Sequence, residues 1–178
     1  MRTRFLALLR GINVGGKNII KMVDLKTCFE EMGFQNVLTY IQSGNVLFDS
    51  EETNQFKLIQ QIEKALTEKF NYNSKVVLLT QQALIQLVNV APKDFGVYPN
   101  EYRYDVIFLK HPLSSEEALS KIKTKAGVDF VMAGKDVLYF TRLSAMSGQS
   151  QMTKMIGTAI YKEMTIRNWN TTTKLAGL

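Results

Sequence analysis

An apolar run leads directly into a glycine-rich segment at Phe5-Leu6-Ala7-Leu8-Leu9-Arg10-Gly11-Ile12-Asn13-Val14-Gly15-Gly16-Lys17-Asn18. The nearly continuous apolar residues from about position 3 to 9 indicate a central strand that is covered on both faces. Three glycines within six positions indicate a backbone that bends sharply or comes close to another group. The segment supplies cationic and amide donors, but no evident acid, base or nucleophile. It therefore indicates a binding surface and does not identify a reaction.

The residues that follow alternate between helical and extended patterns. Apolar residues first recur at the spacing of one helix face, at Leu25, Cys28, Phe29 and Met32. Asp24 is the expected N-cap of this helix and Gly33 its expected stop. Because Cys28 falls on the inner face, we expect it to pack in the core. Extended patterns at 36–41 and 46–49 follow, joined by the turn Gln42-Ser43-Gly44-Asn45.

A second helix is predicted from about 54 to 70, then a strand at 75–79 and a helix capped by Thr80. The inner face of the second helix is expected to carry Phe56, Ile59, Ile62, Leu66 and Phe70. This order of elements is the split βαβ, or ferredoxin-like, arrangement. Its first two strands run in the same direction, so the loop after one and the turn after the other lie at the same sheet edge. We therefore expect Arg10–Asn18 to meet Gln42–Asn45.

The same order of elements is predicted again in the second half, without visible sequence repetition. Its elements are a strand at 102–109, a helix that the capping box Ser114-Ser115-Glu116-Glu117 opens and that runs to about Lys125, a hairpin over 130–141, a helix over 152–163, a short strand near 165–166 and a last helix after Asn170. The sequence thus predicts an α+β fold of two ferredoxin-like halves, with largely antiparallel sheets and helices packed on one face. The halves are residues 1–91 and 101–178, and residues 92–100 connect them.

Composition narrows the class of protein. The 178 residues are 46% hydrophobic and 21% charged, which is typical of a soluble globular protein. The net charge of +6 favours anionic partners, although an ordinary basic cytosolic protein has a similar balance. A single cysteine excludes an intrachain disulfide framework and a thiolate zinc cluster. With neither a signal peptide nor a spanning run, we expect a cytoplasmic location and no membrane association.

Familiar catalytic and cofactor motifs do not fit this sequence. Gly11-x-x-x-x-Gly16-Lys17-Asn18 lacks the Ser or Thr that holds magnesium in a P-loop, and its spacing also misses the dinucleotide fingerprint. The only histidine, His111, precedes Pro112 and has no triad or metal partners in the sequence. No cofactor and no metal site are expected. What remains is a backbone and a lysine that could cradle an anion.

A second candidate patch lies near the C-terminus, at Arg167, Asn168, Trp169, Asn170 and Lys174. The only tryptophan stands there between polar and cationic residues, which could stack on a base and hydrogen-bond to it. The alternative is that Trp169 anchors the last helix and Asn170 caps it. The sequence leaves both interpretations open.

Three blocks carry a family resemblance: Leu9–Lys17, Thr39–Val46 and Arg167–Thr171. Together they resemble the bacterial family catalogued as domain of unknown function 1697, and the resemblance covers essentially the whole chain. It implies an α+β fold made of two related halves. It implies no activity, so the three blocks mark a candidate site without a chemistry.

Three functions remain open. The first is binding of a phosphate-bearing ligand, a nucleotide or nucleic acid. Its candidate residues are Arg10, Asn13, Gly15, Gly16, Lys17, Asn18, Gln42, Ser43, Gly44 and Asn45. The second is an enzyme that relies on electrostatic catalysis by Lys17, Arg10 and Ser43 at the same edge. The third is a protein–protein adaptor, including a homodimer formed through exposed sheet edges.

Overall fold

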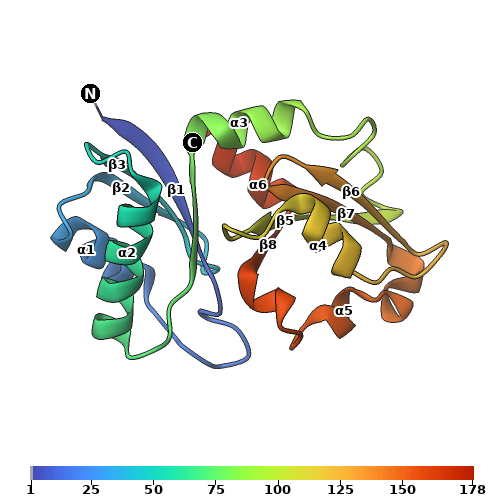
Figure 1. Cartoon of the computed structure of the whole chain (residues 1–178), viewed down its shortest axis with the longest axis horizontal. Helices are drawn as coiled ribbons and strands as arrows, with labels where there is room; N and C mark the ends of the chain where they lie inside the picture. The colour runs from blue at the N-terminus through green and yellow to red at the C-terminus, as the bar shows by residue number, and fades with distance from the viewer. Residues whose placement is uncertain (1) are drawn as a thin grey trace. The chain divides into compact units, whose positions relative to one another are not determined.

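The computed structural model describes residues 2–178, which form two compact units. One unit ends at Leu84 and the other spans Ile85–Leu178, so the division falls within helix α3 (Gln81–Asn89). Each unit contains one four-stranded antiparallel sheet with helices packed against it (Figure 1). The predicted α+β class with two related halves is therefore confirmed.

The first unit follows the predicted order of elements. These are β1 (Thr3–Leu9), α1 (Met22–Glu31), β2 (Gln35–Tyr40), β3 (Asn45–Ser50), α2 (Gln55–Phe70) and β4 (Val76–Thr80), followed by the start of α3. The strand order is β2-β3-β1-β4, and every neighbouring pair is antiparallel. Because β3 lies between β1 and β2, those two strands run in the same direction. The loop after β1 and the turn after β2 consequently end at one edge of the sheet.

The core of the first unit lies between its sheet and the helices α1 and α2. Alternate residues of β1, among them Phe5 and Leu9, face these helices, while Leu6 and Leu8 on the opposite face are also buried. This double burial explains the unbroken apolar run of β1. Cys28 packs in the same core and is 2% exposed, so its predicted packing role is confirmed.

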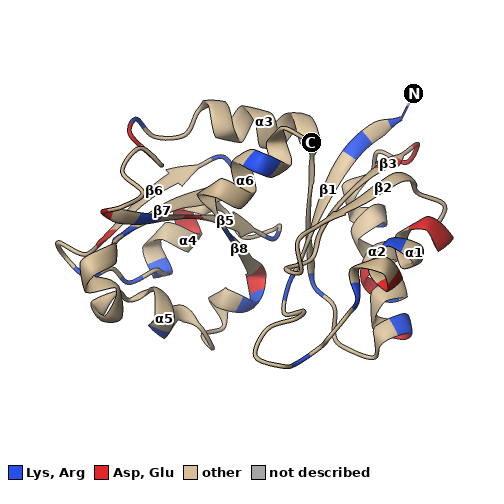
Figure 2. Cartoon of the chain, turned by 180° about the vertical axis from the view of Figure 1, so that it is seen from behind, with Lys and Arg blue, Asp and Glu red and all other residues tan. Residues whose placement is uncertain are grey.

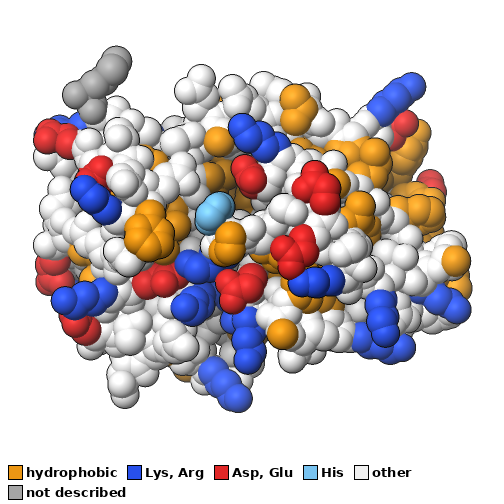
Figure 3. Space-filling view, in the orientation of Figure 1, with side chains coloured by type: hydrophobic (Ala, Val, Ile, Leu, Met, Phe, Trp, Pro, Cys, Tyr) orange, Lys and Arg blue, Asp and Glu red, His pale blue; other side chains and the backbone are white. Residues whose placement is uncertain are grey.

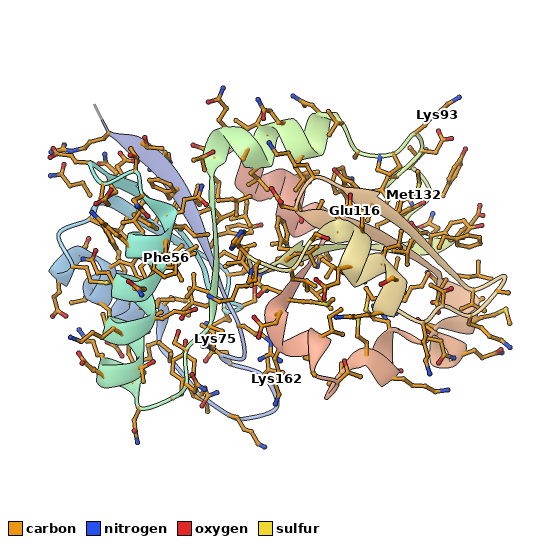
Figure 4. The ribbon with its side chains drawn as sticks, in the orientation of Figure 1. Phe56, Lys75, Lys93, Glu116, Met132 and Lys162 are labelled. Atoms are coloured by element: carbon orange, nitrogen blue, oxygen red, sulfur yellow. The ribbon has the colours of Figure 1, made fainter. Side chains whose placement is uncertain are left out.

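Two details of the first unit differ from the sequence prediction. Helix α1 begins at Met22 with Lys21 as its N-cap residue, which places Asp24 in the first turn, so the prediction of Asp24 as N-cap was wrong. Phe56 was predicted to face inward but is 68% exposed on α2 (Figure 4). The buried stripe contains Leu58 instead, and a residue two positions away points to nearly the opposite side of a helix.

The second unit repeats the strand order of the first. Its elements after α3 are β5 (Tyr102–Leu109), α4 (Ser115–Lys121), β6 (Asp129–Gly134), β7 (Val137–Leu143), the 3₁₀ helix η1 (Ser144–Gln149), α5 (Met152–Met155), the 3₁₀ helix η2 (Ile160–Glu163), β8 (Met164–Asn168) and α6 (Trp169–Ala176). The sheet order is β6-β7-β5-β8, again with all neighbours antiparallel. The first and third strands of the unit are thus its two central strands.

Helices cover both faces of the second sheet. Ala118 of α4 and Met152 of α5 pack with Leu138 and Phe140 on one face. On the other face, the hydroxyl of Tyr139 donates a hydrogen bond to the carbonyl of Leu87 in α3 at 2.6 Å. Helix α6 also packs against β5 and β8. In the first unit, helices α1 and α2 both pack on one face of the sheet, so the two units differ in how helices are distributed over the sheet faces.

The helices of the second unit are shorter than the periodicity predicts. Helix α4 ends at Lys121 rather than near Lys125. The helix predicted over 152–163 is one turn of α5 followed by η2, and Gly157 between them has a φ of +93°, which no helical residue adopts. No helix among residues 2–178 combines the length and the apolar character needed to cross a membrane.

Candidate functional site

The glycine-rich loop and the β2–β3 turn contact each other, as the topology predicted. The amide N–H of Leu9 donates to the carbonyl of Gly44 at 2.8 Å. The side-chain amide of Asn13 donates to the carbonyl of Gln42 at 2.8 Å. Gly44 packs so closely that a Cβ there would lie 2.7 Å from Cδ1 of Ile12. We call the surface formed by Arg10–Asn18 and Gln42–Asn45 the glycine-loop edge.

Two asparagine side chains hold the loop in shape. Besides Gln42, the side chain of Asn13 bonds to both the carbonyl and the amide of Ile20, at 3.0 and 2.8 Å. Asn18 donates to the carbonyl of Gly11 at 2.8 Å. Both asparagines have positive φ, a conformation that this residue type tolerates well. In the structure these amides position the loop, and their predicted contact with a ligand stays a prediction.

Gly15 and Gly16 form a tight turn at the tip of the loop. Val14 and Lys17 pair across it, and the amide of Lys17 donates to the carbonyl of Val14 at 3.1 Å. The φ angles of +59° and +74° at the two glycines are those of a hairpin turn that side chains disfavour. Helix α1 starts only at Met22, whereas a P-loop continues directly into its helix. The tip is therefore an exposed hairpin with Lys17 at its base.

The β2–β3 turn contains a residue that the sequence did not single out. Ile41 has a φ of +50° although it is β-branched, and its side chain is about half exposed. Such backbone strain persists only where the surroundings maintain it, and it clusters at functional sites. Asn45 maintains this turn: its fully buried amide donates to the carbonyl of Tyr40 at 2.9 Å and to Oγ of Ser43 at 3.0 Å. Asn45 is thus a positioning residue and is not exposed to a ligand.

The glycine-loop edge has a one-sided charge. Arg10, Lys17 and Lys21 lie in the loop, while residues 5–23 and 35–48 include no aspartate or glutamate (Figure 2). Lys17 and Lys21 are exposed and have no ion-pair partner within residues 2–178. Arg10 is half-buried, and its backbone N–H donates to the carbonyl of Lys75 at 3.0 Å. The edge therefore presents cations to solvent from a fixed backbone.

The residues of the C-terminal patch differ in exposure. Arg167 is 8% exposed on β8, where burial lowers its pKa to about 10. Asn168 caps α6 by accepting a hydrogen bond from the amide of Thr171 at 2.8 Å, so the prediction of Asn170 as the cap was wrong. Asn170 and Lys174 are exposed.

Trp169 anchors α6, as the alternative interpretation predicted. Its ring lies edge-on to Phe95 with 5.0 Å between centroids. A Cβ at Gly96 would lie 2.2 Å from Nε1 of Trp169, so the indole packs directly on this glycine. The ring is half-buried and therefore is not a free stacking surface for a base.

Sequence reasoning missed an aromatic hollow in the second unit. It has a volume of about 270 Å³ and lies between the 92–98 connector and the sheet. Its aromatic lining consists of Phe95, Tyr98, Tyr102, Tyr104, Phe130 and Tyr139. Large apolar or aromatic residues alternate at 102/104 and at 130/132, which was a signal. The sequence could not show that these side chains share one face of the sheet. Among residues 2–178 no three His, Cys, Asp or Glu side chains gather in a way that could hold a metal ion.

The family model described as "Protein of unknown function (DUF1697)" matches residues 2–139. The chain belongs to this family. The matched DUF1697 region includes the whole glycine-loop edge, whereas Arg167–Thr171 lies outside it. No curated protein matches the chain.

One solved structure extends the fold comparison across the whole DUF1697 chain. A conserved bacterial protein from Streptococcus pneumoniae superposes with a TM-score of 0.86, covering 99% of this chain and 98% of its own. At 24% sequence identity, this likeness shows the fold alone.

Proposed function

We propose that this protein binds a phosphate-bearing ligand, a nucleotide or a nucleic acid, at the glycine-loop edge. The observation that carries the proposal is the pairing of a fixed glycine backbone with the exposed Lys17, in segments 5–23 and 35–48 that include no aspartate or glutamate. The Gly15-Gly16 tip is open, since a Cβ at either position would meet no atom within 4 Å. Backbone N–H groups of such turns, together with a lysine, form the concavities that bind anions.

The residues of the edge have two different roles in this proposal. Lys17, Arg10 and the backbone at Gly15-Gly16 face the ligand and bind its phosphate. Asn13, Asn18 and Asn45 hold the two segments in place through the hydrogen bonds described above. Because these bonds form without a ligand, the site is preorganised and loses little conformational entropy on binding.

Exposed apolar side chains beside the cations favour a nucleotide over inorganic phosphate. Val14 is 66% exposed and Ile19 is 76% exposed, on either side of Lys17 in the sequence. An inorganic anion would use neither side chain. A sugar and base would cover both, and burial of apolar surface adds to affinity.

Titration calorimetry with ATP and with a short single-stranded oligonucleotide, each at low and high salt, tests this function. Lys17→Ala should weaken binding by roughly 1–3 kcal/mol, the contribution of a charge-assisted hydrogen bond. Wild-type affinity should fall as salt rises, because salt screens the attraction. Lys17 is exposed, so this variant should unfold at the same urea concentration as the wild type.

Lys64→Ala is the matched control, since it removes one exposed lysine from α2 in the same unit. It should leave the affinity unchanged beyond a small effect of net charge. The proposal would be refuted if neither ATP nor the oligonucleotide bound at low salt. Equal losses in Lys17→Ala and Lys64→Ala would also refute it, because the attraction would then be only that of the overall charge.

A further inference from the structure

The aromatic hollow of the second unit has ring walls and a small polar floor. Thr141 of β7 lies opposite Phe130 of β6 on one side and Tyr104 of β5 on the other. Neighbouring strands are about 4.8 Å apart, so the two ring-bearing backbones are separated by roughly 10 Å across the threonine. Tyr102 closes one end, with its ring centroid 6.4 Å from that of Phe130. The threonine floor is thus bordered by rings on two sides and at one end.

The rim of the hollow is accessible, whereas Tyr139 is buried. Phe130 and Tyr98 are each about half exposed, and Met132 beside them is also exposed. Hydrophobic side chains gather over this end of the second unit (Figure 3). The hydroxyls of Tyr98 and Tyr102 have no hydrogen-bond partner within residues 2–178, which leaves them available to a ligand.

The position of the rings on the sheet indicates the class of ligand. Tyr102 and Tyr104 lie on the first strand of the unit and Tyr139 on the third, and these are the two central strands. Aromatic residues on a four-stranded sheet of this order stack the bases of single-stranded nucleic acid in RNA-recognition domains. Here Tyr139 is buried, so Tyr102 and Tyr104 of the first strand and Phe130 of the neighbouring hairpin are the rings open to a base. The physical reason is general, because every base has a flat π-face that stacks on an aromatic ring.

Charge complementarity favours the same ligand. Residues 85–178 include 12 Lys and Arg against 8 Asp and Glu, so this unit carries +4 of the chain's net charge of +6. Lys93 and Asp94 both line the hollow, and Lys93 extends outward from the connector (Figure 4). The base would occupy the apolar hollow while the phosphates remain outside it, on a unit whose net charge is positive.

We propose that the aromatic hollow binds single-stranded nucleic acid by stacking a base between Phe130 and Tyr104, over Thr141. This inference does not rest on the glycine-loop edge, which belongs to the other unit. It also predicts a property that binding at the glycine-loop edge lacks, since affinity must depend on the rings of Phe130 and Tyr104.

The chain has a built-in reporter for this test. Trp169 is the only tryptophan, and its ring contacts Phe95, which lines the hollow. A ligand in the hollow should therefore change the fluorescence of Trp169. We would titrate the full chain with a ten-nucleotide oligo-dT, with oligo-rU of the same length and with an abasic strand of the same length. The DNA and RNA arms show whether the 2′-hydroxyl contributes.

The oligonucleotides that carry bases should bind at least about tenfold more tightly than the abasic oligonucleotide, as expected for one stacked base. Phe130→Leu should lose most of this difference, because it removes a half-exposed ring while retaining an apolar side chain. Thr141→Phe should lose it as well, because it fills the floor while retaining every ring. Tyr102→Phe should retain it, since the ring remains.

Phe56→Leu is the matched control, because it removes an exposed ring from α2, in the other unit. It should leave the preference for bases unchanged. Binding at the glycine-loop edge does not need the rings of the hollow, so the loss expected for Phe130→Leu separates the two proposals. Equal affinity for strands with and without bases would overturn the proposal. A proline-rich peptide that alone changes Trp169 fluorescence would overturn it too, because such peptides also dock on aromatic grooves.

Discussion

Gly44→Ala should destabilise the first unit far more than its single added methyl group suggests. The φ of Gly44 is +76°, which costs an alanine roughly 1–2 kcal/mol. The new Cβ would also lie 2.7 Å from Cδ1 of Ile12 and 2.8 Å from Cβ of Leu9. Both neighbours are about 1% exposed, so neither can move into solvent, and overpacking of this kind costs a further 1–3 kcal/mol or so. We therefore expect a total loss of about 2–5 kcal/mol.

The matched variant is Gly16→Ala, at a φ of +74° but with no atom within 4 Å of the new Cβ. It should show only the backbone cost, so the difference between the two variants isolates the steric contribution. Urea unfolding followed by far-ultraviolet circular dichroism measures both. Ile12→Val removes the Cδ1 atom in the closest contact and should recover part of the loss in a double-mutant cycle. Equal destabilisation by the two alanines, or no recovery by Ile12→Val, would show that the turn and the loop are not in the contact described.

Two further predictions concern stability and titration. Cys28→Ser should destabilise the protein by roughly 1–3 kcal/mol, because a buried hydroxyl needs a hydrogen-bond partner. Burial raises the pKa of the native thiol, so Cys28 should react slowly with a thiol reagent until the protein unfolds. Burial raises the pKa of Asp49, but hydrogen bonds from Asn36 and Arg4 outweigh this effect and hold the pKa below the ordinary value of 3.8. The ionised carboxylate therefore stabilises the fold above that value, and this stabilisation is lost as pH falls through the lowered pKa. Between about pH 5 and pH 3, the urea midpoint of Asp49→Asn should change less than the midpoint of the wild type. An unchanged pH profile in Asp49→Asn would contradict this assignment.

Local sequence patterns determined the elements where one side of an element is clearly apolar. The strand at 102–109 was predicted with the observed bounds, and the turn chemistry of Gln42-Ser43-Gly44-Asn45 located the β2–β3 connection. The pattern failed where tertiary contacts override it, as for Phe56 and for the helix that Gly157 interrupts. Periodicity identifies an apolar stripe, but it does not say which of two neighbouring stripes meets the sheet.

The sequence by itself determined the βαββαβ order, and from that order the meeting of Arg10–Asn18 with Gln42–Asn45. Topology is enough for this inference, because strands that run in the same direction end at the same edge. Only the tertiary structure showed that Asn13 and Asn45 hold the two segments in place, since a side-chain amide looks the same in the sequence whatever it bonds to. The hairpin predicted over 130–141 already pairs β6 with β7, but only the structure set the register that surrounds the aromatic hollow with rings. Its walls come from Tyr104 and Phe130, 26 residues apart in the chain, and a cavity between strands depends on register, which no local pattern specifies.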